Sequence, residues 1–151
     1  MEGLDKKLII EVCGSNLLQK KDVLLSALRE IEESMLTETK SSLGDKHETS
    51  RAKMQVEQEK LGKQLQEIES QLNILHQIDH HKREIKANFG ALVTTNFGTF
   101  FISVGLGRIQ CLQKEILAVS PLSPIAKAFD GLTIQDSFIF NEKQFQIKAI
   151  E

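Results

Sequence analysis

Apolar residues recur every seven positions in the first half of the chain, in two runs separated by a polar segment. The first run consists of Ile10, Leu17, Leu24 and Ile31, with Leu28 and Met35 at intervening positions. The second run consists of Met54, Leu61, Leu65, Ile68, Leu72 and Leu75, with Gln58 as a polar insertion. Heptad spacing is typical of helices that pack along one seam. The two runs therefore predict an antiparallel helical hairpin over residues 1–80, each arm about 45 Å long at 1.5 Å per residue.

In the second half of the chain, the heptad spacing of apolar residues ends and segments typical of β-strands follow. Asp79 to Lys82 reads as a linker or a frayed helix end. Residues 91–94, 99–104 and 116–119 are rich in residues that favour strands, and turn-like sequences occupy 96–98 and 105–107. These segments predict an antiparallel sheet.

The last part of the chain predicts a short helix and a closing β-hairpin. Ser123 suits the N-cap of the helix, Pro124 its first position, and Gly131 the position just past its end. In the hairpin, alternation places Phe138 with Phe140 on one face of the first strand, and Phe145, Ile147 and Ala149 on one face of its partner. The prediction is an α+β chain: a coiled-coil hairpin over 1–80 and a small β domain with one short helix over 88–151.

Composition agrees with this division and narrows the function classes. All eight Phe residues lie from Phe89 onward, so the aromatic residues belong to the β-rich half. The net charge of −2 argues against non-specific binding to naked nucleic acid, which needs a basic face. Cys13 and Cys111 are expected to be reduced thiols. The apolar patch at residues 8–10 is far too short to span a membrane, and no signal peptide is recognisable, so we expect a cytoplasmic protein.

The polar segment between the two helical runs is the main candidate for chemistry. Its tip, near residues 41–49, contains Asp45 and Glu48. Carboxylates of this kind bind Mg²⁺ weakly by themselves, but they can help to retain a second metal ion at a site that another molecule supplies. The same spacing also fits a capping box, in which Asp45 and Glu48 bond the first backbone N–H groups of the second arm. The spacing leaves both interpretations open.

Other candidate residues offer less. His76 and His80 are four residues apart, but no third zinc ligand lies nearby in the sequence. Cys111 has no obvious base and is expected to be a buried thiol. Phe100 and Phe101 are adjacent and so face opposite ways; we expect one in the core and the other available as a contact surface.

Two segments resemble one known family. Gly44-Asp45-Lys46-His47-Glu48-Thr49 resembles the hairpin-tip motif of the bacterial Gre transcript-cleavage factors, which reads glycine, aspartate, two residues, glutamate, asparagine. Thr49 stands in place of the asparagine, and the aromatic residue common in the second arm is missing. The segment from Val119 to Ala126, followed by Gly131 and Asp136, resembles the carboxy-terminal domain of the same family, with its Ser-Pro turn, short helix and closing hairpin.

The resemblance implies a coiled coil followed by a domain like the FK506-binding proteins. It also implies that the globular domain docks on bacterial RNA polymerase and that the coiled coil enters the secondary channel. Asp45 and Glu48 would reach the polymerase active site near the RNA 3′ end, hold Mg²⁺ jointly with the polymerase and promote cleavage of backtracked RNA. Partner-binding residues would be Ser120, Pro121, Ser123 and Pro124. The protein would be a monomer and would not bind a membrane. It would have no cofactor of its own and would not itself be an enzyme.

Three other function classes stay open at this stage. A regulator could occupy the same channel without promoting cleavage, as the substitution at Thr49 allows. A peptidyl-prolyl isomerase is suggested by the domain type, although the β-rich half has only about 60 residues and offers no Trp or Tyr for a proline pocket. A coiled-coil adaptor would use Asp45 and Glu48 only to cap a helix.

Overall fold

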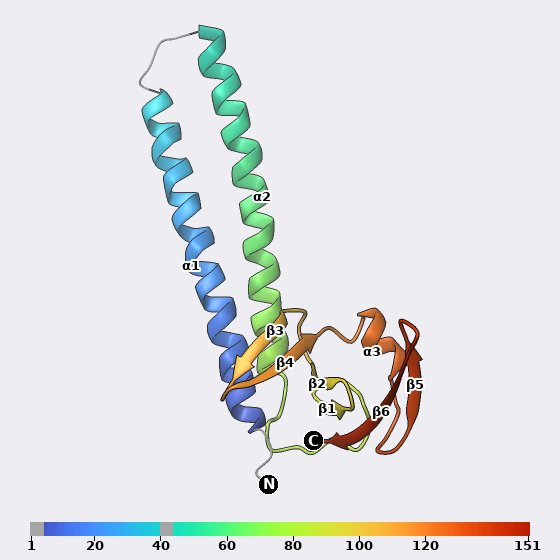
Figure 1. Cartoon of the computed structure of the whole chain (residues 1–151). Helices are drawn as coiled ribbons and strands as arrows, with labels where there is room; N and C mark the ends of the chain where they lie inside the picture. The colour runs from blue at the N-terminus through green and yellow to red at the C-terminus, as the bar shows by residue number, and fades with distance from the viewer. Residues whose placement is uncertain (1–4, 40–43) are drawn as a thin grey trace. The chain divides into compact units, whose positions relative to one another are not determined.

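The computed structural model describes residues 5–39 and 44–151, except the side chains of residues 38, 39 and 44–47. Two long helices are followed by six strands and one short helix (Figure 1), which confirms the predicted α+β class. The chain divides into two compact units. One is the hairpin unit, residues 16–72; the other, the β unit, combines residues 1–15 with residues 73–151. The assignment of the β-rich part to the FK506-binding type stays a prediction.

The hairpin unit is built from two long helices. Helix α1 (Lys6–Thr39) has 34 residues and α2 (Gly44–His76) has 33. The heptad seam is confirmed in residues 16–72, where Leu17, Leu61 and Ile68 are buried. Lys21 of α1 lies 3.8 Å from Glu69 of α2 in a partly exposed ion pair between the two arms. Most other seam positions are half-buried, because two helices alone cannot cover each other's apolar stripes.

The first turns of α1 depart from the predicted seam. Ile9 and Cys13 are fully buried, whereas Ile10, which the heptad pattern placed in the seam, is only half-buried. The reason is that residues 1–15 belong to the β unit. Packing within that unit, and not the pairing of the two arms, therefore selects the buried face of α1 there.

Two glycines inside the long helices, Gly14 in the β unit and Gly62 in the hairpin unit, allow a test of helix stability. A Cβ atom built on Gly14 of α1 or on Gly62 of α2 meets no heavy atom within 4 Å. Glycine inside a helix costs about 0.5–1 kcal/mol relative to alanine. We therefore expect Gly14→Ala and Gly62→Ala each to raise the free energy of unfolding in urea by about that amount. A lower free energy of unfolding in either variant would contradict the open space found around that glycine.

The β unit contains one six-stranded sheet in the order β3-β4-β2-β1-β6-β5. Its strands are β1 (Leu92–Thr95), β2 (Gly98–Ile102), β3 (Gly107–Cys111), β4 (Lys114–Val119), β5 (Ser137–Phe140) and β6 (Lys143–Ile150). Neighbouring strands run antiparallel, except that β2 and β4 are parallel. The sequence did not predict β3. The turn from β3 to β4 uses Leu112 and Gln113 at φ 50° and 65°, without the glycine or asparagine that normally marks such a turn.

Both faces of the sheet are buried at its centre. Phe100 is 5% exposed and lies in the core cluster with Phe129 and Phe145, and its neighbour Phe101 on the opposite face is fully buried. The expectation that one of the two adjacent phenylalanines forms a contact surface is therefore wrong. Aromatic rings meet within this largely aliphatic cluster; the Phe100 and Phe129 ring centroids lie 5.6 Å apart.

The closing hairpin is confirmed with one correction. Phe145 and Ile147 of β6 are buried as predicted, but Ala149 is exposed and Ile150 is buried instead. The pairing of β1 with β6 shifts register between Thr94 and Thr95, which pair with Ala149 and Ile147. The extra residue in β6 is a β-bulge, and it moves every following side chain to the other face.

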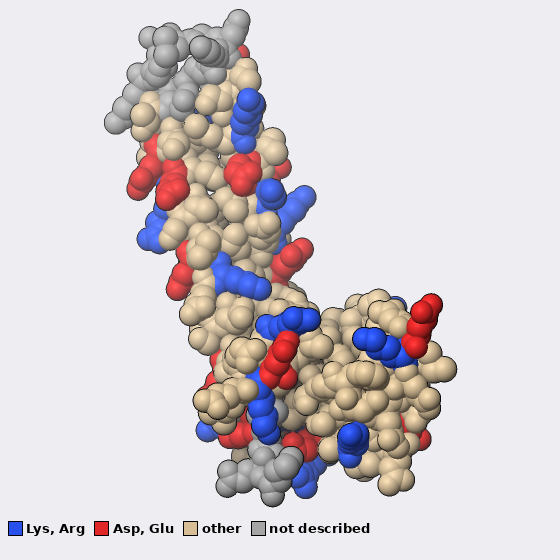
Figure 2. Space-filling model, in the orientation of Figure 1, with Lys and Arg blue, Asp and Glu red and all other residues tan. Residues whose placement is uncertain are grey.

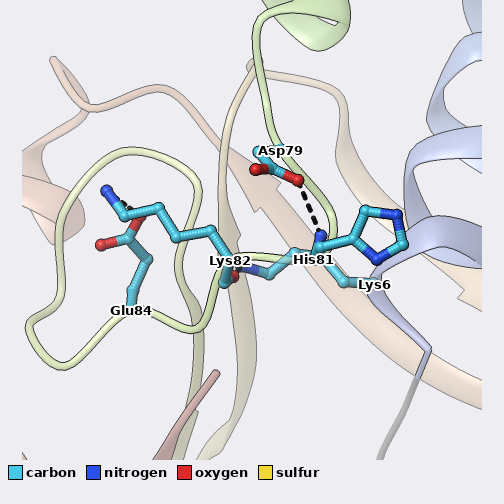
Figure 3. A network of polar contacts seen from close by, with 5 residues as sticks. All are labelled: Lys6, Asp79, His81, Lys82 and Glu84. Carbon is cyan, nitrogen blue, oxygen red and sulfur yellow. Dashed lines mark hydrogen bonds and ion pairs between the residues drawn. The ribbon is translucent and has the colours of Figure 1, made fainter.

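A polar network joins the start of α1 to the segment after α2. Buried Lys6 donates from its ammonium group to the Lys82 carbonyl at 3.0 Å. Burial lowers the pKa of Lys6, and the carboxylates of Glu84 and Asp79 are among the charges that oppose this shift. Lys82 pairs with Glu84 at 3.3 Å, and the His81 backbone N–H donates to Asp79 at 2.9 Å (Figure 3). These contacts all involve the segment that follows the end of α2 at His76.

The two cysteines are free and buried, as expected. Burial raises the pKa of Cys13 to about 11, and the nearby Cys111 thiol adds to the effect. Burial also raises the pKa of Cys111, to which the Asp5 carboxylate contributes. Both side chains therefore act as small apolar groups of the core and as poor nucleophiles at neutral pH.

The raised pKa of Cys13 predicts a loss of stability in alkali. Below about pH 9 the thiol is neutral in both the folded and the unfolded chain; above that pH the unfolded chain loses the proton first. We expect the free energy of unfolding to fall by up to about 3 kcal/mol between about pH 9 and about pH 11 through this group. Urea unfolding of the parent and of Cys13→Ala over this range isolates the contribution. Equal losses in the two proteins would contradict it.

Candidate functional site

The reversal between α1 and α2 is the first candidate site. Because α1 ends at Thr39 and α2 begins at Gly44, Asp45 and Glu48 both lie in the opening turns of α2. Residues three apart are neighbours on a helix surface, so the two positions share a face. Glu48 is exposed, whereas the Asp45 side chain lies outside the described part of the structure. Asp45 lies within the first turn of the helix and not in the position before it, which a capping box requires.

The hairpin unit holds this pair far from its other end. About 36 Å of helix separate Glu48 from Leu72, at 1.5 Å per residue. Acidic residues in the first turn are also favourable beside the partial positive charge of a helix N-terminus. The fold can thus place carboxylates at the end of a long, narrow support.

The two carboxylates at this tip are too few to enclose a divalent cation by themselves. Asp45 and Glu48 supply two carboxylates, while Mg²⁺ takes about six oxygen ligands, often from one or two carboxylates together with a substrate and waters. Among the described residues, no group of three or more His, Cys, Asp or Glu is placed to hold a metal ion. The zinc pair considered from the sequence is not on one helix face either, because α2 ends at His76 before His80.

The Ser-Pro turn is the second candidate site. Ser123 is the N-cap of α3 (Pro124–Ala128), and its hydroxyl accepts from the Ala126 N–H at 3.3 Å, as predicted. The same hydroxyl donates to the Ser120 carbonyl at 2.7 Å, and the Ser120 hydroxyl accepts from the Leu122 N–H at 3.1 Å. Both serines therefore shape the turn.

The exposed groups of this turn are apolar. Pro121 and Pro124 are exposed, and Leu122 between them is 78% exposed. An exposed leucine in a turn that internal hydrogen bonds hold in shape is suited to burial against a partner. Of the four residues predicted to bind a partner, the two prolines are exposed, and Leu122 between them is a further exposed apolar residue of the turn.

An apolar pocket borders the turn. Its volume is about 310 Å³, and its lining residues are Phe100, Leu117, Val119, Ile125, Phe140, Asn141, Lys143 and Phe145. Val119 and Ile125 directly flank the turn in sequence. At the rim, Lys143 lies 5.5 Å from the centroid of the exposed Phe97 ring, which packs edge-on against Phe145 at 4.8 Å. A pocket of this size accepts an apolar side chain of a partner.

The charge pattern is mixed on the face of the hairpin unit that Figure 2 draws. Figure 2 shows acidic and basic side chains interspersed along the hairpin unit on the face drawn, without a continuous basic stripe. Binding to duplex nucleic acid through its phosphates would need such a stripe. Within the described residues, no helix is long and apolar enough to cross a membrane.

Comparisons with known proteins give only a limited likeness to solved structures. No protein-family model and no curated protein matches the chain. A solved structure, described as that of the transcription factor Gfh1, is similar over 92% of this chain and 93% of its own length, at 16% identity and a TM-score of 0.37. A likeness at this level supports no argument about activity.

Proposed function

We propose that this protein is a transcription elongation factor that binds bacterial RNA polymerase in the cytoplasm and stimulates cleavage of backtracked RNA. The observation that supports this best is the position of Asp45 and Glu48 in the opening turns of α2, where the chain reverses between two helices of 34 and 33 residues. The tip motif and the Ser-Pro segment that resemble the Gre factors both lie in elements that the structure contains.

In this proposal the hairpin enters the secondary channel of the polymerase. In the complex, Asp45 and Glu48 would hold a Mg²⁺ ion jointly with the polymerase, and that ion would supply Lewis-acid chemistry for the activation of water. A water oxygen attacks the phosphorus of the RNA, the bond from phosphorus to the 3′ oxygen breaks, and that oxygen leaves with a proton. This chain supplies two carboxylates and the polymerase supplies the rest of the catalytic site, so the protein is an activator and not a free-standing enzyme.

The β unit serves for docking in this proposal. Leu122, Pro121 and Pro124 present an apolar surface beside the pocket lined by Ile125 and Phe145. An apolar side chain of the polymerase that fills the pocket would be anchored at the centre of an interface, where most binding energy resides.

Cleavage of RNA by a stalled polymerase tests the proposal. Polymerase halted in a backtracked position is incubated with Mg²⁺, with and without the protein, and the labelled RNA is followed by gel electrophoresis. Faster shortening of the RNA from its 3′ end is the expected result. Binding to polymerase without any acceleration would overturn the cleavage assignment.

A second candidate function is favoured by one observation. Thr49 follows Glu48 where the related motif has asparagine, and no aromatic residue follows in the second arm. A protein with this tip can occupy the channel and block it without promoting hydrolysis. The same assay separates the two functions, since a blocking regulator would leave the RNA intact or slow the polymerase's own cleavage.

A further inference from the structure

A groove runs along one side of the hairpin unit. Three hollows with volumes of about 580, 430 and 540 Å³ follow each other between residues 16 and 71. The first two share Val23 and the last two share Glu30, and this row of three neighbouring hollows is here named the side groove. Every residue that lines it belongs to the hairpin unit.

The α1 wall of the side groove has a regular spacing. Its lining residues include Asn16, Lys20, Val23, Ala27, Glu30, Ser34 and Thr37, which follow each other at alternating intervals of four and three. That spacing marks a second straight stripe on α1, next to the seam that packs against α2. The stripe extends about 32 Å at 1.5 Å per residue. The small side chains of Ala27 and Ser34 leave room for close approach of another helix.

The side groove is apolar at one end and acidic along its length. Val23, although 69% exposed, lines the groove together with Leu24 and Ile68.

Four carboxylates line the groove, those of Asp22, Glu30, Glu33 and Glu67, against the single cationic side chain of Lys20. None of the four carboxylates forms a salt bridge or a side-chain hydrogen bond with another described residue. Among the described residues that line the groove, negative charge therefore exceeds positive charge.

We propose that the side groove binds a basic amphipathic helix of a partner protein. A helix of about 20 residues matches the length of the stripe. Its small apolar side chains would lie over Val23 and Ala27, and its Lys or Arg side chains would face the groove carboxylates. This proposed binding site is separate from the proposed cleavage function, since no residue of the groove belongs to the tip or to the Ser-Pro turn. Each of the two proposals can be correct without the other.

A synthetic helix provides the probe. A fluorescein-labelled peptide of about 20 residues, with an Ala and Leu stripe flanked by Lys and Arg, is titrated with the full-length protein and followed by fluorescence anisotropy. We expect saturable binding, and no binding of a peptide in which Glu replaces every Lys and Arg. The double variant Glu30→Lys with Glu33→Lys should weaken binding at least about tenfold, through two lost attractions and two new repulsions.

Matched variants separate the groove from general charge effects. Glu57→Lys with Glu59→Lys makes the same change of net charge at exposed positions of α2 that line none of the three hollows, and should alter binding less than about twofold. Ala27→Gln narrows the groove without a change of charge and should weaken binding. Circular dichroism confirms that each variant is helical. Absence of saturable binding by the parent, or equal weakening by both charge pairs, would overturn the proposal.

Discussion

Replacement of Asp45 by Asn together with Glu48 by Gln is expected to abolish stimulated cleavage of backtracked RNA. The two substitutions keep the size of each side chain and remove both negative charges, and with them the ability to hold a divalent cation. Loss of groups that support a catalytic metal ion should lower the stimulated rate by about a hundredfold or more. The measurement is the first-order rate of RNA shortening in backtracked complexes at saturating protein.

The control variant for this experiment lies on the same helix. Glu57→Gln with Glu59→Gln removes the same charge from exposed positions of α2 and should leave cleavage unchanged. Binding of each variant to polymerase is measured by competition with the labelled parent protein, and we expect equal affinities. If the Asp45 and Glu48 double variant still cleaves at the parental rate, these carboxylates have no catalytic role. If the parent itself slows cleavage, the blocking function is the correct one.

The helical part of the fold could be predicted because its physical signal is local. Heptad positions such as Leu61 and Ile68 need only a partner helix of the same length, and both are buried as the spacing indicated. The prediction was wrong at the start of α1, where Ile9 is buried in place of Ile10. Which of the two isoleucines is buried depends on packing within the β unit, and the heptad spacing of apolar residues carries no information about that packing.

The β-rich part was less predictable because its signals are not local. Strand β3 carries a glycine and two polar or charged side chains beside Ile109 and Cys111, and its turn lacks the usual residues, so no strand could be predicted there from the sequence. The bulge in β6 depends on pairing with β1, which only the assembled sheet defines.

The candidate sites also differ in how far the sequence could predict them. The acidic tip was found through a short motif, because Asp45 and Glu48 are close in sequence. The pocket was missed, because its walls come from five elements that meet only in the folded unit. The side groove was not predicted for another reason. Its α1 stripe contains the charged residues Lys20 and Glu30 at heptad positions, and a search for regularly spaced apolar residues does not detect such a stripe.

Replacement of Leu122 by Asp is expected to weaken binding to RNA polymerase while leaving the fold intact. Leu122 is 78% exposed, so a charge there costs the free protein little. Burial of a leucine at an interface is worth about 1.5–3 kcal/mol, which corresponds to a loss of affinity of about tenfold to a hundredfold. The matched control is Leu112→Asp, at a 72% exposed position in the turn from β3 to β4, where φ of 50° suits aspartate.

The dependence of cleavage on protein concentration distinguishes docking from chemistry in this variant. A docking residue contributes to the affinity of the complex and not to the reaction within it, so Leu122→Asp should need about tenfold to a hundredfold more protein and then reach the parental cleavage rate. A lower rate at saturation would mean that Leu122 also sets the position of the hairpin tip. Parental affinity for Leu122→Asp would show that the polymerase binds elsewhere on the β unit, and the pocket beside the Ser-Pro turn would then lose its proposed role.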